Sequence, residues 1–198
     1  MTKTGWWVTG LMSLFNLTDS DKNILRDIAR QSIAYGLTNQ RALPVKTSDF
    51  SPLLQTLGAS FVTLNLHHQL RGCIGTLEAH QSLVNDVSEH AYAAAFEDPR
   101  FNPVTENEIN QLDIHISILT PAHAIQFTSE QDLLEQLQPG KDGLILQAGR
   151  HKATFLPSVW EQLTASVDFL NHLKVKAGLN KADWPEDIQV LRYSTISF

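Results

Sequence analysis

The residues best suited to chemistry lie between Leu70 and Gly75, a segment that holds the only cysteine of the chain. Cys73 stands between Gly72 and Gly75, whose small size lets backbone amides approach a ligand and form a concave site for an anion. A thiol becomes nucleophilic when a nearby cation lowers its pKa. Arg71 would be that cation if the strand is regular, because residues two apart then point to the same face. The alternative is a structural cysteine that packs as a small hydrophobic residue.

A second group of charged side chains follows in the turn Asp98-Pro99-Arg100. Proline fixes the backbone between an anion and a cation, and such a turn can present a carboxylate to a substrate. Asp98 would then be an orienting base or a polar contact, and Arg100 a substrate contact. In the alternative, Asp98 and Arg100 pair with each other or hold the loop on the sheet. Residues 71–75 and 98–100 together predict a cleft.

Eight histidines raise the question of a metal site. They show neither the spacing of a zinc-protease helix nor cysteine partners, so we predict no metal ligands. Two of them, on the polar faces of predicted strands, could converge only if those strands were neighbours. The eight are His67, His68, His80, His90, His115, His123, His151 and His172, and the two are His67 and His115.

The first elements that must position these residues follow from the periodicity of the apolar side chains. Helical spacing over residues 24–37 predicts an amphipathic helix. Alternation in 61–66, a polar turn and the return of 70–76 predict a hairpin. Ser82 opens a helix that ends before Pro99, and the alanines on its inner stripe indicate close approach to another element.

The rest of the chain continues with short strands and helices. We predict a capping box at 105–108, a strand at 112–119, helices at 129–137 and 167–177, a hairpin joining 144–146 to 153–156, and a last strand at 188–193. Trp160 would be a core anchor or a pocket wall. Strands in hairpins, interspersed with helices but without regular βαβ alternation, are typical of the α+β class with a mostly antiparallel sheet.

Composition is that of one soluble globular domain, with 42% hydrophobic and 18% charged residues in 198. A formal net charge of -6 argues against nucleic acid as the main partner, because phosphate binding needs clustered Lys and Arg. A single cysteine excludes an internal disulfide, and a reducing cytoplasm is the simplest location.

The first sixteen residues are predicted to form an extension in front of a domain at 17–198. The apolar stretch 5–15 is shorter than the roughly 20 residues of a membrane-spanning helix, so we expect no membrane association. It also lacks the cleavage signal of a leader peptide. Two explanations stay open: Met12 is the true start, or the segment is a docking arm that covers a surface.

Several ordered motifs carry a resemblance to a known family. They are Leu-Arg-Gly-Cys-Ile-Gly at 70–75, Ala-Ala-Phe-Glu-Asp-Pro-Arg-Phe at 94–101 and Phe-Leu-Pro-Ser-Val-Trp at 155–160. Over roughly residues 17–198 the chain resembles the AMMECR domain family. The resemblance implies a two-lobed α+β fold, and for bacterial and archaeal members a likeness to protein A of the AmmeMemoRadiSam system. Partners would then include a Memo-type protein and a radical S-adenosylmethionine protein, whereas no reaction or cofactor is implied.

Two functions of different classes follow. The chain could be an enzyme or enzyme component, with Cys73 as nucleophile or thiol ligand and Asp98 as base in the cleft. Alternatively, the same loops, together with Trp6-Trp7, form a binding surface for the Memo-type or radical partner, without bond chemistry. RNA binding through a local basic patch is a third, less favoured reading.

Overall fold

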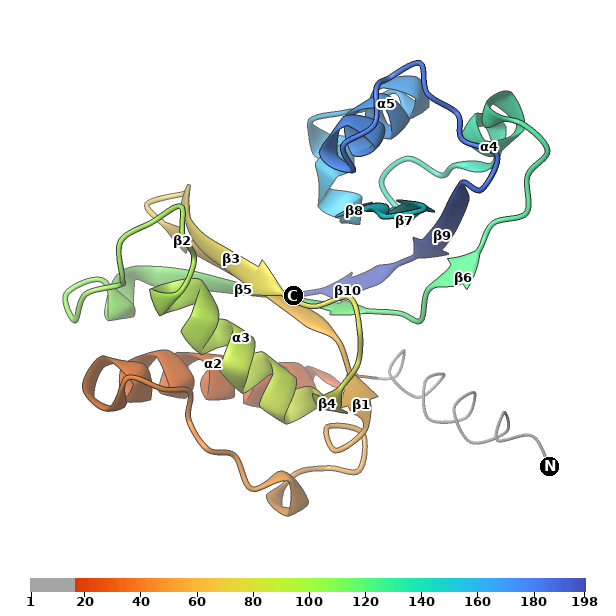
Figure 1. The fold of residues 1–198 in the computed structure, drawn as a ribbon. Helices are drawn as coiled ribbons and strands as arrows, with labels where there is room; N and C mark the ends of the chain where they lie inside the picture. Colours follow the sequence, from red (N-terminus) through yellow and green to blue (C-terminus); the bar gives the residue numbers. More distant parts are fainter. Residues whose placement is uncertain (1–16) are drawn as a thin grey trace. The chain divides into compact units, whose positions relative to one another are not determined.

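A computed structural model describes residues 17–198, which divide into two compact units (Figure 1). Unit 1 comprises residues 17–119 and 196–198, and unit 2 comprises residues 120–195. Each unit combines helices with an antiparallel sheet, so the predicted α+β class is confirmed. The boundary predicted at residue 16, the residues Trp6-Trp7 and the Met12 alternative lie outside the described part of the chain.

The sheet of unit 1 has four strands in the order β10-β5-β2-β3. They are β10 (Thr195–Ser197), β5 (Leu112–Leu119), β2 (Ser60–Leu66) and β3 (Gln69–Gly75). The predicted hairpin is present as β2 and β3, and its two turn residues His67 and His68 have φ angles of 51° and 64°. Two positive φ values in a two-residue turn match the twist that antiparallel strands require.

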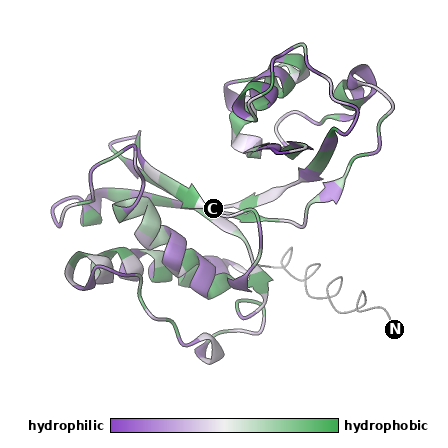
Figure 2. Cartoon of the chain, in the orientation of Figure 1, coloured by the Kyte–Doolittle hydropathy of each residue, from purple (hydrophilic) through white to green (hydrophobic). Residues whose placement is uncertain are grey.

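Two helices, α2 (Asp19–Asn39) and α3 (Leu83–Phe96), lie on the same face of this sheet (Figure 1). α2 begins with a capping box between Thr18 and Asp21. Polar and apolar residues interleave along both helices, as Figure 2 shows, which fits elements buried on one side only. Their apolar stripes close over alternate strand residues, and the core of unit 1 includes Leu25, Ile33, Val62, Leu64, Val87, Ala91, Ile114 and Ile116.

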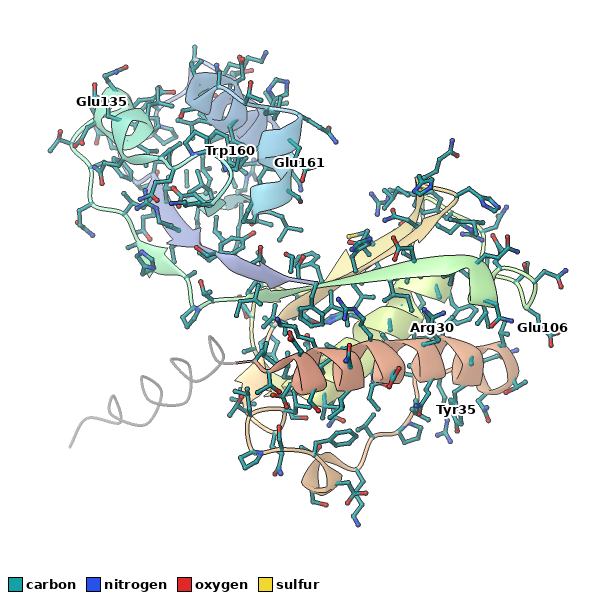
Figure 3. The ribbon with its side chains drawn as sticks, turned by 180° about the vertical axis from the view of Figure 1, so that it is seen from behind. Arg30, Tyr35, Glu106, Glu135, Trp160 and Glu161 are labelled. Carbon is teal, nitrogen blue, oxygen red and sulfur yellow. The ribbon has the colours of Figure 1, made fainter. Side chains whose placement is uncertain are left out.

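Unit 2 has a second four-stranded sheet in the order β6-β9-β7-β8. Its strands are β6 (His123–Ala124), β9 (Gln189–Tyr193), β7 (Gly143–Ala148) and β8 (His151–Phe155), and its helices are α4 (Glu130–Gln136), the 3-10 helix η4 (Pro157–Glu161) and α5 (Ser166–Lys176). Trp160 is buried, stacks on Phe169 at 3.9 Å between centroids and donates to the carbonyl oxygen of Asp142. It is therefore a core anchor, and Figure 3 shows it pointing into unit 2.

The remaining elements of unit 1 are short: the 3-10 helices η2 (Thr47–Asp49) and η3 (Ile109–Gln111), and the paired strands β1 (Leu57–Gly58) and β4 (Gln81–Ser82). The last strand predicted from the sequence ends at Tyr193, and β10 follows it in the structure; β10 is too short to show alternation. No helix in residues 17–198 combines the length and the apolar character needed to cross a membrane.

Candidate functional site

A β-bulge in β3 decides which way Cys73 faces. Asn65 pairs with Leu70, but Leu64 pairs with Gly72, so Arg71 is an additional residue in β3. A bulge of one residue exchanges the two faces of the strand beyond it. Cys73 consequently pairs with Thr63, on the face opposite α2 and α3, while Ile74 packs against the core.

The face that carries Cys73 will be called the helix-free face. It consists of side chains from three neighbouring strands that are half-buried or exposed, namely Phe61, Thr63, Asn65, Cys73, Asp113, His115 and Ser117. The Sγ of Cys73 lies 3.1 Å from the Oγ1 of Thr63. Thr63 is also the register partner of His115, so the three side chains form a row across the sheet.

The Asp98-Pro99-Arg100 turn lies along the outer edge of β3. The backbone N–H of Cys73 donates to Oδ2 of Asp98 at 2.9 Å. The carbonyl oxygen of Cys73 accepts from Nη2 of Arg100 at 3.2 Å. Arg100 also donates to both carboxylate oxygens of Asp98, at 2.9 and 2.7 Å. The pair therefore takes the place of a neighbouring strand and satisfies an edge that would otherwise be open.

The electrostatics of this turn limit what Asp98 can do. Its side chain is only 2% exposed. The hydrogen bonds from Arg100 hold the pKa of Asp98 well below its ordinary value, against the opposing effect of burial, and the Cys73 amide lowers it further. A carboxylate kept ionised in this way is a poor proton acceptor, so the turn corresponds to the structural alternative rather than to a general base.

Arg71 has a different partner from the one predicted. Its guanidinium donates to both carboxylate oxygens of Glu108, at 2.8 and 3.3 Å, and to the carbonyl oxygens of Asn102 and Pro103. The hydrogen bond from Arg71, against the opposing effect of burial and together with two bonds from Thr105, lowers the pKa of Glu108 to about 2. The condition for an Arg71–Cys73 pairing, a regular strand, is not met because Arg71 is the bulged residue.

The glycines of the motif are explained by packing inside unit 1. A Cβ atom on Gly72 would overlap the carbonyl oxygen of Ala94 in α3, and one on Gly75 would overlap Phe61 and the carbonyl oxygen of Ser60. Neither glycine has a positive φ. Space, rather than conformational freedom, therefore requires glycine at both positions. The predicted close approach of α3 to another element is present at Ala94, whose backbone lies against Gly72 of β3.

The histidines occupy separate places in the structure. His115 Nε2 lies 2.8 Å from Oδ2 of Asp113 on the helix-free face, and His67 is in the hairpin turn. Within residues 17–198, no three His, Cys, Asp or Glu side chains gather where they could hold a metal ion together.

Thr63 and Glu108 make contacts that the sequence does not predict. Thr63 could have been noted as the outward residue between Val62 and Leu64, but its pairing with Cys73 depends on the bulge. Glu108 was recognised only as part of a capping box. Its carboxylate does accept from the N–H and Oγ1 of Thr105, and it binds Arg71 as well.

Comparisons with known proteins extend over almost the whole described chain. A family model described as AMMECR1 matches residues 26–198. Protein MJ0810 of Methanocaldococcus jannaschii is 37% identical over 142 residues, covering 70% of this chain and 71% of that protein. Protein SSO0193 of Saccharolobus solfataricus is 33% identical over 199 residues, with 95% and 85% covered.

A solved structure has the same fold. The crystal structure of an uncharacterized protein, PH0010 from Pyrococcus horikoshii, aligns with a TM-score of 0.80 and 31% sequence identity, covering 87% of this chain and 88% of that one. The family match, the relatives and the shared fold agree with the resemblance carried by the motifs at 70–75, 94–101 and 155–160. The chain belongs to the AMMECR1 family.

Proposed function

We propose that the chain is a binding module whose recognition surface is the helix-free face around Cys73. One observation carries the proposal: the charged side chains of the predicted cleft form ion pairs inside unit 1. Asp98 binds Arg100 and the Cys73 amide, and Arg71 binds Glu108. A guanidinium paired with a carboxylate forms a group that is neutral as a whole, so it stabilises a nearby thiolate less than a lone cation would. These groups hold β3 in place and leave the thiol on the surface they support.

The side chains of the helix-free face suit contact with a protein. Phe61 provides a half-buried aromatic ring, and Thr63, Asn65 and Ser117 provide hydrogen-bonding groups beside it. An apolar centre with polar surroundings is the common composition of a non-obligate interface. The partner we propose is the Memo-type protein or the radical S-adenosylmethionine protein that the family resemblance implies.

The test measures binding of each purified partner to the full chain. Thr63→Arg places a long charged side chain on the helix-free face and should abolish binding. The matched control is Thr38→Arg, which makes the same change at an exposed position near the end of α2. Cys73 is half-buried rather than fully buried, so we expect a small reagent to alkylate it in the native protein, and a bound partner should slow that reaction. Equal binding by both arginine variants would contradict the proposal.

A second candidate, a thiol enzyme, is favoured by the His115–Asp113 pair on the same face as Cys73. His115 is two strands away, about 10 Å across the sheet, so a substrate would have to lie between the two groups. In this reading His115→Ala slows the alkylation of Cys73 at neutral pH. A binding module gives the same alkylation rate in both proteins.

A further inference from the structure

Unit 2 contains a pocket that is separate from the helix-free face. Its volume is about 640 Å³, within the range of small-molecule sites. Two stretches of chain line it. Residues 124–128 lead from β6 toward α4, and residues 184–186 and 188–190 lead into β9. The N–H of Ile125 donates to the carbonyl oxygen of Val190 at 2.9 Å and so joins the two stretches at one end.

Two aromatic rings form adjoining walls of this pocket. Phe127 and Trp184 have centroids 5.6 Å apart and planes inclined at 58°. Both side chains are half-buried, so part of each ring remains open. The face of an aromatic ring carries negative electrostatic potential, and two inclined rings can both turn a face to the same guest.

The residues that line this pocket carry negative charge only. Glu186 is its only ionisable residue. This exposed carboxylate has no hydrogen bond or ion pair with any residue in 17–198. Lys174, which lies outside the lining, places its Nζ 5.7 Å from the Trp184 centroid. Glu130 neutralises it at 2.8 Å. Glu186 therefore leaves the pocket with an uncompensated negative charge.

From these observations we infer that the pocket binds an organic ammonium ion, with the cation against Phe127 and Trp184 and near Glu186. Aromatic faces combined with a carboxylate attract a cation whose hydration is weak, and alkylated ammonium groups have that property. Neither wall depends on the helix-free face, so the inference is independent of the proposed function. The ammonium could belong to a small molecule or to a trimethylated lysine side chain.

The experiment is a titration of the full chain by calorimetry with choline and with its neutral isostere 3,3-dimethylbutanol. We expect choline to bind about fivefold more tightly than the isostere, the size of one cation–aromatic contact. A parallel pair, Nα-acetyl-trimethyllysine amide and its neutral tert-butyl isostere, distinguishes the two sources: preference for choline over the lysine derivative indicates a small molecule, and the reverse indicates a polypeptide.

Variants assign the binding to this pocket. Trp184→Leu and Glu186→Gln should each weaken choline binding, by about fivefold and about threefold. Glu161→Gln should leave it unchanged, because Glu161 is an exposed acid of η4 outside the lining (Figure 3). Since Glu186 is exposed and unpaired, its variant keeps the fold even if Trp184→Leu does not. Equal binding of cation and isostere, no binding of either cation at millimolar concentration, or an unchanged Glu186→Gln protein would overturn the inference.

Discussion

The carboxylate of Asp98 accepts the backbone N–H of Cys73 at 2.9 Å. This bond joins the turn after α3 to the edge strand of the unit 1 sheet. The Asp98-Pro99-Arg100 turn and the cysteine motif are therefore joined in one hydrogen-bonded network. Their shared role is to hold Cys73 on the helix-free face with its outward backbone groups satisfied.

Asp98→Asn should destabilise the protein while leaving its shape intact. Asparagine keeps one acceptor for the Cys73 N–H but loses the charge that binds Arg100. We expect the free energy of unfolding in urea to fall by about 1–3 kcal/mol, the range for hydrogen bonds to charged groups, and nearer the lower end because Arg100 is 53% exposed. An unchanged urea midpoint would show that the turn does not hold the strand.

Acid should weaken unit 1 through Glu108. Its folded pKa of about 2 lies below the ordinary value of 4.5. A depressed pKa contributes stability that is complete above about pH 4.5 and is lost as pH falls toward 2. The stability difference between the native protein and Glu108→Gln should therefore be constant from pH 7 to 5 and shrink between pH 4.5 and 3. Urea unfolding at each pH measures it, and a constant difference throughout would contradict the Arg71–Glu108 assignment.

Gly72→Ala should be severely destabilising because the new methyl group would meet the Ala94 carbonyl oxygen, which cannot move without shifting α3. We expect a loss of about 3 kcal/mol or more, the upper end of the cost of overpacking. Gly140→Ala is the comparison. Gly140 has φ +79°, and an added Cβ would meet no atom within 4 Å, so the substitution costs only backbone strain of about 1 kcal/mol. If Gly72→Ala folds normally and loses only ligand or partner binding, the glycine serves a site rather than packing.

The parts of the fold that sequence predicted are those with a local signal. α2, α3 and β5 each show a full period of apolar residues, and the hairpin has its own turn at His67-His68. Local periodicity and turn chemistry are sufficient for such elements. The short β10 has neither, and its pairing with β5 is set by the fold.

The orientation of Cys73 could not be predicted from the hairpin alone. A two-residue turn followed by regular pairing would place Cys73 opposite Val62, on the core face. The bulge at Arg71 moves it opposite Thr63 instead. Because the bulged arginine is held by Glu108, 37 residues away, the face of the cysteine is decided by a tertiary contact with no local sequence signal.

The ion pair between Lys174 and Glu130 in unit 2 predicts that removing either partner has a different effect on the free energy of unfolding. Lys174 in α5 is fully buried, and its Nζ lies 2.8 Å from Oε1 of Glu130 in α4, whose side chain is 32% exposed. Breaking such a pair by removing one partner leaves an uncompensated buried charge, whereas replacing that charge by an apolar side chain of similar length removes the penalty.

Glu130→Gln should therefore cost more than Lys174→Met, although both abolish the same ion pair. We expect about 2 kcal/mol for Glu130→Gln, less than for a fully buried partner because water reaches Glu130. Lys174→Met should stay within about 1 kcal/mol of the native protein, since methionine keeps the apolar contacts of the lysine stem. The double variant should resemble Lys174→Met, because no buried charge then remains. Urea unfolding of the three variants measures this order, and a larger loss for Lys174→Met would mean that the lysine stabilises unit 2 through its charge.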